Sequence, residues 1–121
     1  MQTELSSEYP NLDISILAIN QIGAEAGIVQ ASQVGTLPIM NDDSSTDIWN
    51  NWGGIWRDVY VLNRQNQVVD VYNLTSHNLA PNYGTCSIAT STDQESCETV
   101  GAIWTSNYDQ LKQLFVTAAL Q

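Results

Sequence analysis

The apolar positions of the chain gather in short runs that predict strands in its first two thirds. Residues 13–20 (Asp-Ile-Ser-Ile-Leu-Ala-Ile-Asn) are apolar at nearly every position, a pattern typical of a strand buried on both faces. Residues 57–63 and 67–73 form two further apolar runs joined by a polar turn, which predicts a hairpin. These runs indicate a sheet as the centre of the fold.

Helical patterns lie before and after the first strand. Residues 1–8 resemble the last turns of a helix that Tyr9 and Pro10 end. Residues 24–33, with Gly35 as a stop, predict a helix that completes a β-to-α unit. Residues 36–40 read as extended, and the polar loop 41–47 can cap a short helix at 48–52.

The end of the chain carries the clearest helix. Ser106 and Asp109 resemble a capping box. The apolar face that follows comprises Tyr108, Leu111, Leu114, Phe115 and Ala118. Such a helix should pack on the sheet. Residues 76–105, by contrast, read as irregular surface chain punctuated by proline and glycine.

Composition narrows the class of protein. The 121 residues fit one domain, and 13 acidic against 3 basic residues give a net charge of −10. That charge repels nucleic-acid phosphates and anionic lipids. Residues 1–8 resemble no signal peptide, and no apolar run could span a bilayer. We expect neither nucleic acid nor membrane as a partner, and no motif indicates a cofactor.

Cys86 and Cys97 are separated by ten residues rich in serine and threonine. This spacing is wrong for a redox Cys-x-x-Cys pair but suits a local disulfide, with two free thiols as the alternative. A disulfide favours an extracellular or periplasmic location. The scarcity of lysine fits a secreted or marine-type acidic surface.

The order of elements, with residues 37–42 (Leu-Pro-Ile-Met-Asn-Asp) and 52–63 (Trp-Gly-Gly-Ile-Trp-Arg-Asp-Val-Tyr-Val-Leu-Asn), resembles a thioredoxin-like domain of the redoxin type. The similar part is about 1–79 plus 107–120, and about 82–106 would be an inserted disulfide loop. The resemblance implies an α/β fold, a thioredoxin-like sheet with flanking helices, incomplete at its N-terminal side, with a C-terminal hairpin and helix.

Two departures from that family bear on function. Its redox Cys-x-x-Cys has no counterpart here, and Arg57 stands where its cis-proline would align. Thiol exchange requires a low-pKa thiolate at a helix start, so we expect no catalysis and no catalytic residues in this chain. If the true start lies upstream of Met1, with a redox codon in between that encodes selenocysteine and was read as stop, a helix tail at residue one is explained.

The resemblance also implies that a central strand is missing between residues 14–20 and 59–63. Its loss would leave two unpaired edges. Either these two strands pair directly with each other, or their edges pair with another copy of the chain. We therefore expect a rearranged sheet or a homodimer.

Other candidate sites each have a structural alternative. Asp42, Asp43 and Asp47 could hold calcium, but a solvated capping loop is the simpler interpretation. Trp49, Trp52 and Trp56 follow helical spacing and could line a groove with Arg57, or pack in the core.

The remaining polar candidates are interpreted structurally. His77, the only histidine, reads as an exposed loop residue. Arg57 could bind an anion at the edge where the family has its active site, or pair with Asp58 or another acid.

Three functions follow from these patterns. The chain is the body of a thioredoxin-like oxidoreductase without its redox centre, a non-catalytic extracellular module that binds an unknown protein partner, or a calcium-dependent binding or structural module.

Overall fold

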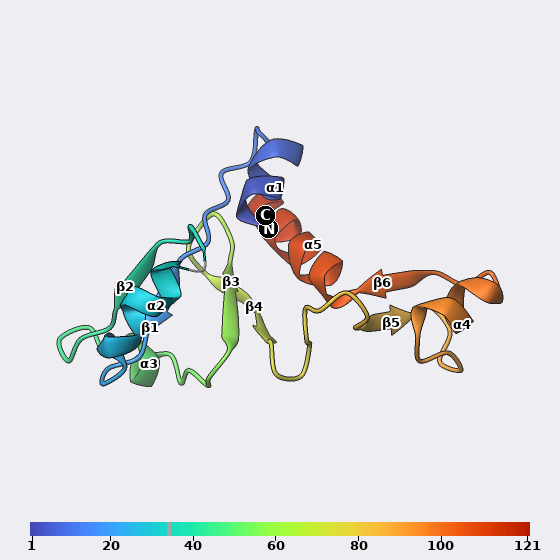
Figure 1. Ribbon diagram of the computed structural model, residues 1–121. Helices are drawn as coiled ribbons and strands as arrows, with labels where there is room; N and C mark the ends of the chain where they lie inside the picture. Colours follow the sequence, from blue (N-terminus) through green and yellow to red (C-terminus); the bar gives the residue numbers. More distant parts are fainter. Residues whose placement is uncertain (34) are drawn as a thin grey trace.

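The strands form three separate two-stranded sheets rather than one. The computed structural model describes residues 1–33 and 35–121, and for residue 32 the backbone only. Within that part of the chain the fold is mixed α/β (Figure 1). β1 pairs parallel with β2, whereas β3 pairs with β4 and β5 with β6 in antiparallel fashion. The strands are β1 Ala18–Asn20, β2 Ile39–Asn41, β3 Asp58–Leu62, β4 Val68–Asn73, β5 Gly84–Cys86 and β6 Trp104–Ser106.

The centre of the molecule, which we call the body, consists of the β3–β4 hairpin, helix α5 (Asn107–Leu120) and helix α1 (Gln2–Glu8) (Figure 1). One face of the hairpin, with Val61 and Tyr72, packs toward α5 and is buried. The other buried apolar residues of the body are Leu5, Leu111, Val116 and Ala118. The predicted hairpin and terminal helix are therefore confirmed, and Val116 joins the predicted apolar face.

The predicted cap by Ser106 at the start of α5 is confirmed, with the Asp109 carboxylate bonded to the Ser106 hydroxyl. The Ser106 hydroxyl accepts from the Asp109 backbone N–H at 3.0 Å and donates to the Asp109 carboxylate at 2.8 Å. These contacts satisfy one of the backbone donors that a helix start leaves without a partner.

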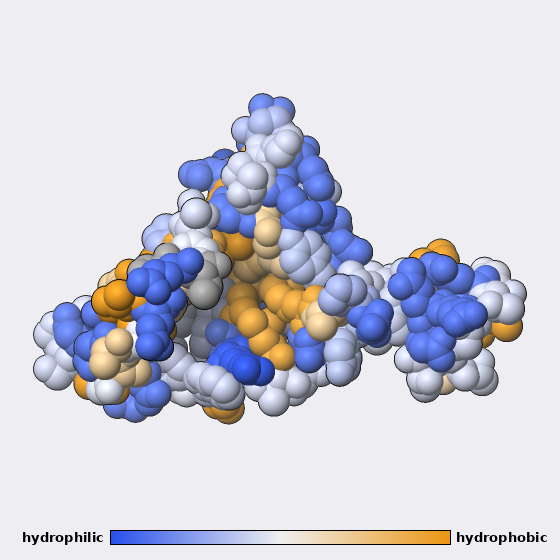
Figure 2. All heavy atoms as spheres, in the orientation of Figure 1, coloured by the Kyte–Doolittle hydropathy of each residue, from blue (hydrophilic) through white to orange (hydrophobic). Residues whose placement is uncertain are grey.

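Two arms extend from the body. The N-terminal arm (residues 18–51) contains β1, β2, a short 3-10 turn (Glu25–Gly27), α2 (Ile28–Gln33) and α3 (Ile48–Asn51); the disulfide unit (residues 84–106) contains β5, α4 (Gln94–Thr99) and β6. Figure 2 shows a hollow between the N-terminal arm and α5 in which apolar residues gather. The body is thus not wrapped by its arms on this face.

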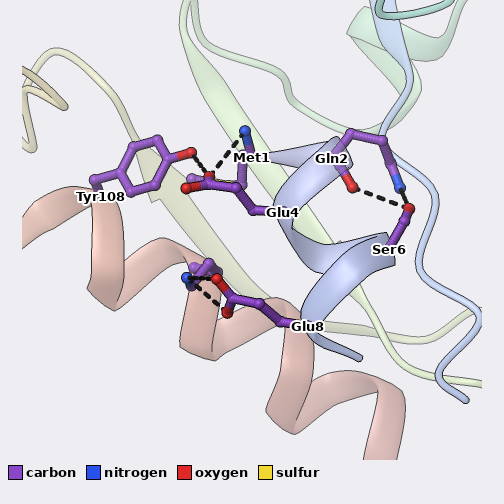
Figure 3. Close-up of polar contacts among 7 residues, drawn as sticks. Met1, Gln2, Glu4, Ser6, Glu8 and Tyr108 are labelled. Atoms are coloured by element: carbon purple, nitrogen blue, oxygen red, sulfur yellow. Dashed lines mark hydrogen bonds and ion pairs between the residues drawn. The ribbon is translucent and has the colours of Figure 1, made fainter. Parts of the chain in front are cut away.

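Helix α1 docks on α5 through polar side chains around one buried leucine. Leu5 is 1% exposed. The Tyr108 hydroxyl donates to the Glu4 carboxylate, and Lys112 Nζ lies 2.9 Å from Glu8 Oε2 (Figure 3). The bond to Glu4 raises the pKa of Tyr108 to about 12. The predicted helix at residues 1–8 is therefore confirmed, and its packing partner is the last helix of the chain.

The prediction of a strand at residues 13–20, buried on both faces, is wrong. The strand comprises only Ala18–Asn20 and is half-buried, while the residues before it alternate between exposed and half-buried. The Gln2 side chain accounts for this difference. It donates to the Ile14 carbonyl and accepts from the Ile16 N–H, both at 2.8 Å. That backbone is bonded to a helix side chain instead of to a neighbouring strand.

Direct pairing of the first predicted strand with the hairpin is not found either. β1 pairs with β2, in register Ala18 with Ile39 through Asn20 with Asn41. Hydrogen bonds from Ala18 N to Pro38 O and from Asp42 N to Asn20 O extend this ladder at both ends. The hairpin remains a sheet of its own.

Residues 76–105 are more ordered than the sequence predicted. β5 and β6 pair with each other, and Asp93 caps α4 by accepting from the Ser96 N–H at 2.8 Å. The two strands approach closely at Gly84, where an added Cβ would lie 2.3 Å from the Thr105 carbonyl oxygen. Such close packing of backbones requires glycine. Gly84, which read as a mark of irregular chain, therefore allows β5 and β6 to pair.

Among the described residues, no helix combines the length and the apolar character needed to cross a bilayer.

Candidate binding loop

Most of the residues singled out by the sequence lie in three places. Asp42, Asp43, Asp47 and Trp49 belong to the N-terminal arm. Residues 52–57 connect α3 to β3, and we call them the aromatic loop. The cysteines close the disulfide unit, with the Cα atoms of Cys86 and Cys97 5.8 Å apart, so the predicted disulfide is confirmed and the alternative of free thiols is wrong.

Asp42 caps the start of α3 from a buried position. Its side chain is 3% exposed. Its two carboxylate oxygens accept, at 3.0 Å each, from the backbone N–H groups of Ile48 and Trp49. Burial by itself would raise the pKa of the Asp42 carboxyl, but these bonds, with one from the Asp43 N–H, hold it below its usual value. The capping prediction is confirmed, while a solvated position is wrong for Asp42.

The neighbouring carboxylates are also occupied by local donors. Asp43 accepts from the Ser45 hydroxyl at 2.6 Å and from the Thr46 N–H at 3.0 Å, and such bonds lower its pKa to about 2. Asp47 accepts from the Asn50 side chain. Within the described part of the chain, no three His, Cys, Asp or Glu side chains are grouped to hold a metal ion. The carboxylates of Asp42, Asp43 and Asp47 thus do not form a set of calcium ligands in the described structure.

The three tryptophans do not share one face. α3 ends at Asn51 with Trp52 as its C-cap, and Gly53 follows with a left-handed φ of 65°, so the helical spacing is interrupted between Trp52 and Trp56. Trp49 is half-buried, and its indole N–H donates to the Ile19 carbonyl at 3.3 Å. Trp52 is 44% exposed, with its ring edge against Tyr60, and Trp56 is 66% exposed. The prediction of core packing is therefore wrong for Trp52 and Trp56.

The tip of the aromatic loop presents two large apolar side chains and a cation. Ile55 is 67% exposed and Trp56 66%. The Arg57 guanidinium carbon lies 4.3 Å from the centroid of the Trp56 ring, a cation–π contact. The loop therefore offers an apolar surface with a positive charge stacked on it.

The prediction that Arg57 forms an ion pair with Asp58 is wrong. The Asp58 carboxylate accepts instead from the Ile55 N–H at 2.9 Å and from the Asn73 side-chain amide at 2.8 Å. In the described residues the ion pairs are Lys112 with Glu8 and the N-terminal amine with Glu4.

A bracket of hydrogen bonds, formed by Asp58 and Asn73, holds the loop in place. The Asp58 N–H donates to the Ile55 carbonyl at 3.0 Å, and the Asn73 amide donates to the Trp56 carbonyl at 3.2 Å. Arg57 has a backbone φ of 69°, a left-handed conformation that costs a bulky residue on the order of 1–3 kcal/mol. Its carbonyl is held by the Leu74 N–H at 2.9 Å.

Sequence reasoning named Trp56 and Arg57 but missed the bracket. Asn73 stands directly opposite Asp58 in the hairpin, so a predicted hairpin brings these two residues together, but nothing local indicates that the same amide also reaches the Trp56 carbonyl. The positive φ of Arg57 follows two glycines, which signal only that a turn is near.

His77 is not the exposed loop residue that was predicted. It is half-buried, its ring is stacked on Tyr72 at 4.3 Å between centroids, and its Nδ1 lies 3.1 Å from the Asn73 carbonyl oxygen. The reason is the tight turn after β4, in which the His77 N–H also bonds to that carbonyl. His77 thus covers the end of the hairpin.

No family model, curated protein or solved structure matches this chain.

Proposed function

We propose that the protein is a non-catalytic binding module that docks on a partner protein through the aromatic loop. The observation that carries the proposal is the combination of a strained, bracketed backbone with the exposed side chains of Ile55, Trp56 and Arg57. Tryptophan and arginine are enriched among residues that dominate protein interfaces. A loop already held in shape loses little conformational freedom on binding.

The total surface of the chain supports this proposal. The structure exposes 8298 Å², whereas a compact protein of 13.3 kDa exposes about 6,500 Å². The surplus of roughly 1,800 Å² exceeds the approximately 800 Å² that one partner contributes to an interface of standard size. A partner that covers part of it would bring the module to ordinary compactness.

The chemistry of the loop indicates what the partner offers. Ile55 and Trp56 fit an apolar pocket. Arg57, whose charge is not neutralised by Asp58, fits a carboxylate at the rim of that pocket. Because Arg57 is one of 3 basic residues in a chain of net charge −10, it marks a distinct point on an acidic surface.

We also propose, from the order of elements and the packing of α5 on the hairpin, that the module is related to thioredoxin-like domains. Its disulfide favours an extracellular or periplasmic location. Because the two cysteines are separated by ten residues instead of forming a Cys-x-x-Cys pair, and Cys97 is buried, we expect the chain to leave the disulfides of insulin unreduced in the presence of a dithiol. Reduction above the background rate of the dithiol would contradict a non-catalytic role.

The test compares two isoleucines of equal exposure. Ile55 is 67% exposed in the loop and Ile103 is 70% exposed in the disulfide unit. A photo-crosslinker placed at Thr75, an exposed residue next to Leu74, whose N–H bonds to the Arg57 carbonyl, would identify bound proteins in the extracellular fraction of the source organism. The partner identified is then purified, and its affinity for each variant is measured by calorimetry.

We expect Trp56→Ala to weaken that affinity about 30-fold or more, the loss typical of a residue that dominates an interface. Ile55→Ala should weaken it less, and Ile103→Ala should leave it unchanged. Equal affinities for wild type, Trp56→Ala and Ile55→Ala would overturn the proposal. Analytical sedimentation of the chain alone tests whether it forms a homodimer. Self-association that Trp56→Ala abolishes would identify a second copy of the chain as the partner.

A further inference from the structure

The outer edge of β4 borders a groove that the aromatic loop does not use. β4 pairs with β3 on one side, and no described strand pairs with it on the other. Beside it lies a cavity of about 590 Å³, lined from the strand by Asp70, Val71 and Tyr72 and from α5 by residues that include Gln113, Leu114 and Thr117. Alternate side chains of a strand point to opposite faces, so three consecutive lining residues mark its edge.

The backbone of Val71 faces this groove. The Leu74 N–H donates to the Arg57 carbonyl, and Tyr72 stands opposite Val59 in the same ladder. Antiparallel pairing directs the backbone groups of alternate residues to opposite edges, so those of Val71 and Asn73 point away from β3. At Asn73 the carbonyl is taken by the His77 N–H at 3.0 Å.

The outward N–H of Val71 has a replaceable partner. It donates to the carboxylate of the preceding residue, Asp70, at 2.8 Å. Asp70 is exposed, and its side chain can rotate away at small cost when another acceptor arrives. A carbonyl of an added strand would occupy the same place and would leave the carboxylate free to bind a cation.

Charge and apolar surface together define what fits the groove. Val71 is 45% exposed and Leu114 is half-buried beside it. Among the described residues that line the groove, none is a lysine or arginine, and Lys112 is engaged by Glu8. A second copy of this chain would bring a second Asp70 and a second net charge of −10 to the same edge. The complementary occupant is an extended segment that alternates apolar and basic residues.

We propose that β4 accepts such a cationic peptide segment as a third strand of its sheet. Main-chain hydrogen bonds to Val71 would provide affinity, the Val71 side chain would contact the apolar side chains on one face of the added strand, and Asp70, on the other face, would bind a lysine or arginine. This is recognition by strand addition. It goes beyond the proposed function because it uses a different surface and a different class of ligand.

The test is a titration of the isotope-labelled protein with a short capped peptide that alternates lysine and valine, followed by NMR. We expect the largest shifts of amide signals at Val69, Val71 and Leu114. The same peptide with glutamate in place of lysine should bind at least about tenfold more weakly, because the peptide's charge is then the same as that of Asp70. Methylation of the peptide nitrogens that face β4 should abolish binding, while methylation of the other set should not.

Two charge-matched variants complete the design. Asp70→Asn should weaken binding about three- to tenfold and flatten its salt dependence. Asp13→Asn removes the same charge from an exposed position outside the groove and should have no such effect. Trp56→Ala should bind the peptide as wild type does, so that failure here and failure of the loop proposal remain distinguishable.

Three results would overturn the inference. The first is the absence of shifts at β4 at millimolar peptide, and the second is equal binding of both methylated peptides. The third is an equal effect of the two aspartate variants, which would show attraction to the whole acidic chain instead of to this groove.

Discussion

The two arms of the molecule perform the same structural task by different chemistry. Each holds a two-stranded sheet and one or two short helices together beside the body (Figure 1). Among the described residues, each has one buried residue, Asp42 in the N-terminal arm and Cys97 in the disulfide unit. Neither arm buries enough apolar surface to be held by hydrophobic packing alone. A hydrogen-bonded carboxylate stabilises one arm and a covalent bond the other.

The difference makes the arms sensitive to different conditions. The hydrogen bonds of Asp42 and Asp43 depend on their charge and therefore on pH. The Cys86–Cys97 bond depends on redox potential. The body, which contains most of the buried apolar residues, should respond weakly to either change.

Removal of the disulfide should have the largest effect and should be confined to one arm. The double substitution Cys86→Ser and Cys97→Ser deletes a cross-link that closes a short loop, which contributes about 2 to 3 kcal/mol. We expect hydrogen exchange to accelerate strongly in α4 and β5 while the Val61 amide remains protected. Equal acceleration at Val61 and Ile48 would show that the arms and the body unfold as one unit.

Removal of the buried carboxylate should release the other arm. Asp42→Ala takes away the acceptors of the Ile48 and Trp49 N–H groups, and we expect amide exchange in α3 to become at least about fivefold faster, as on loss of a helix cap. Asp42→Asn, which keeps one acceptor oxygen, is the matched control and should lose less. Unchanged exchange in Asp42→Ala would mean that Asp42 does not hold α3.

Acid should produce the smallest and most specific effect. Hydrogen bonds led by that of Ser45 lower the pKa of Asp43 from 3.8 to about 2. A lowered pKa in the folded state means that the stabilisation is present above pH 3.8 and is lost as pH falls toward 2. The pKa of Asp42 is lowered too and acts in the same direction.

We therefore expect the amide signals of Ser45, Ile48 and Trp49 to shift or broaden between pH 4 and pH 2, while those of β5 change less. Asp43→Asn should remove part of this pH dependence and reduce the protection of α3 at neutral pH. A transition of the same midpoint in both arms would refute the distinction between them.

Local features could be predicted from the sequence because their causes lie within a few residues. The polar turn of the hairpin, the cap of α5 by Ser106, the loop that caps α3 and the spacing of the two cysteines all act over short distances along the chain. Their residues have few alternative partners. Such elements form in the same way in many tertiary contexts.

The partners of the strands, and the exposure of the candidate site, depended on contacts between distant residues. Gln2 takes the backbone bonds of Ile14 and Ile16, so an apolar run that read as a buried strand became mostly irregular. No pattern in residues 13–20 could show this, because the competing donor and acceptor come from another helix.

The candidate site in the aromatic loop also depended on contacts between distant residues. The sequence by itself supplied Trp56 and Arg57 as candidates, together with the hairpin, the last helix and the disulfide. Only the tertiary structure placed Asn73 against the Trp56 carbonyl and left Trp56 two-thirds exposed. Spacing along a chain determines which residues share a helix face or a turn, whereas burial depends on what packs against that face from elsewhere in the molecule.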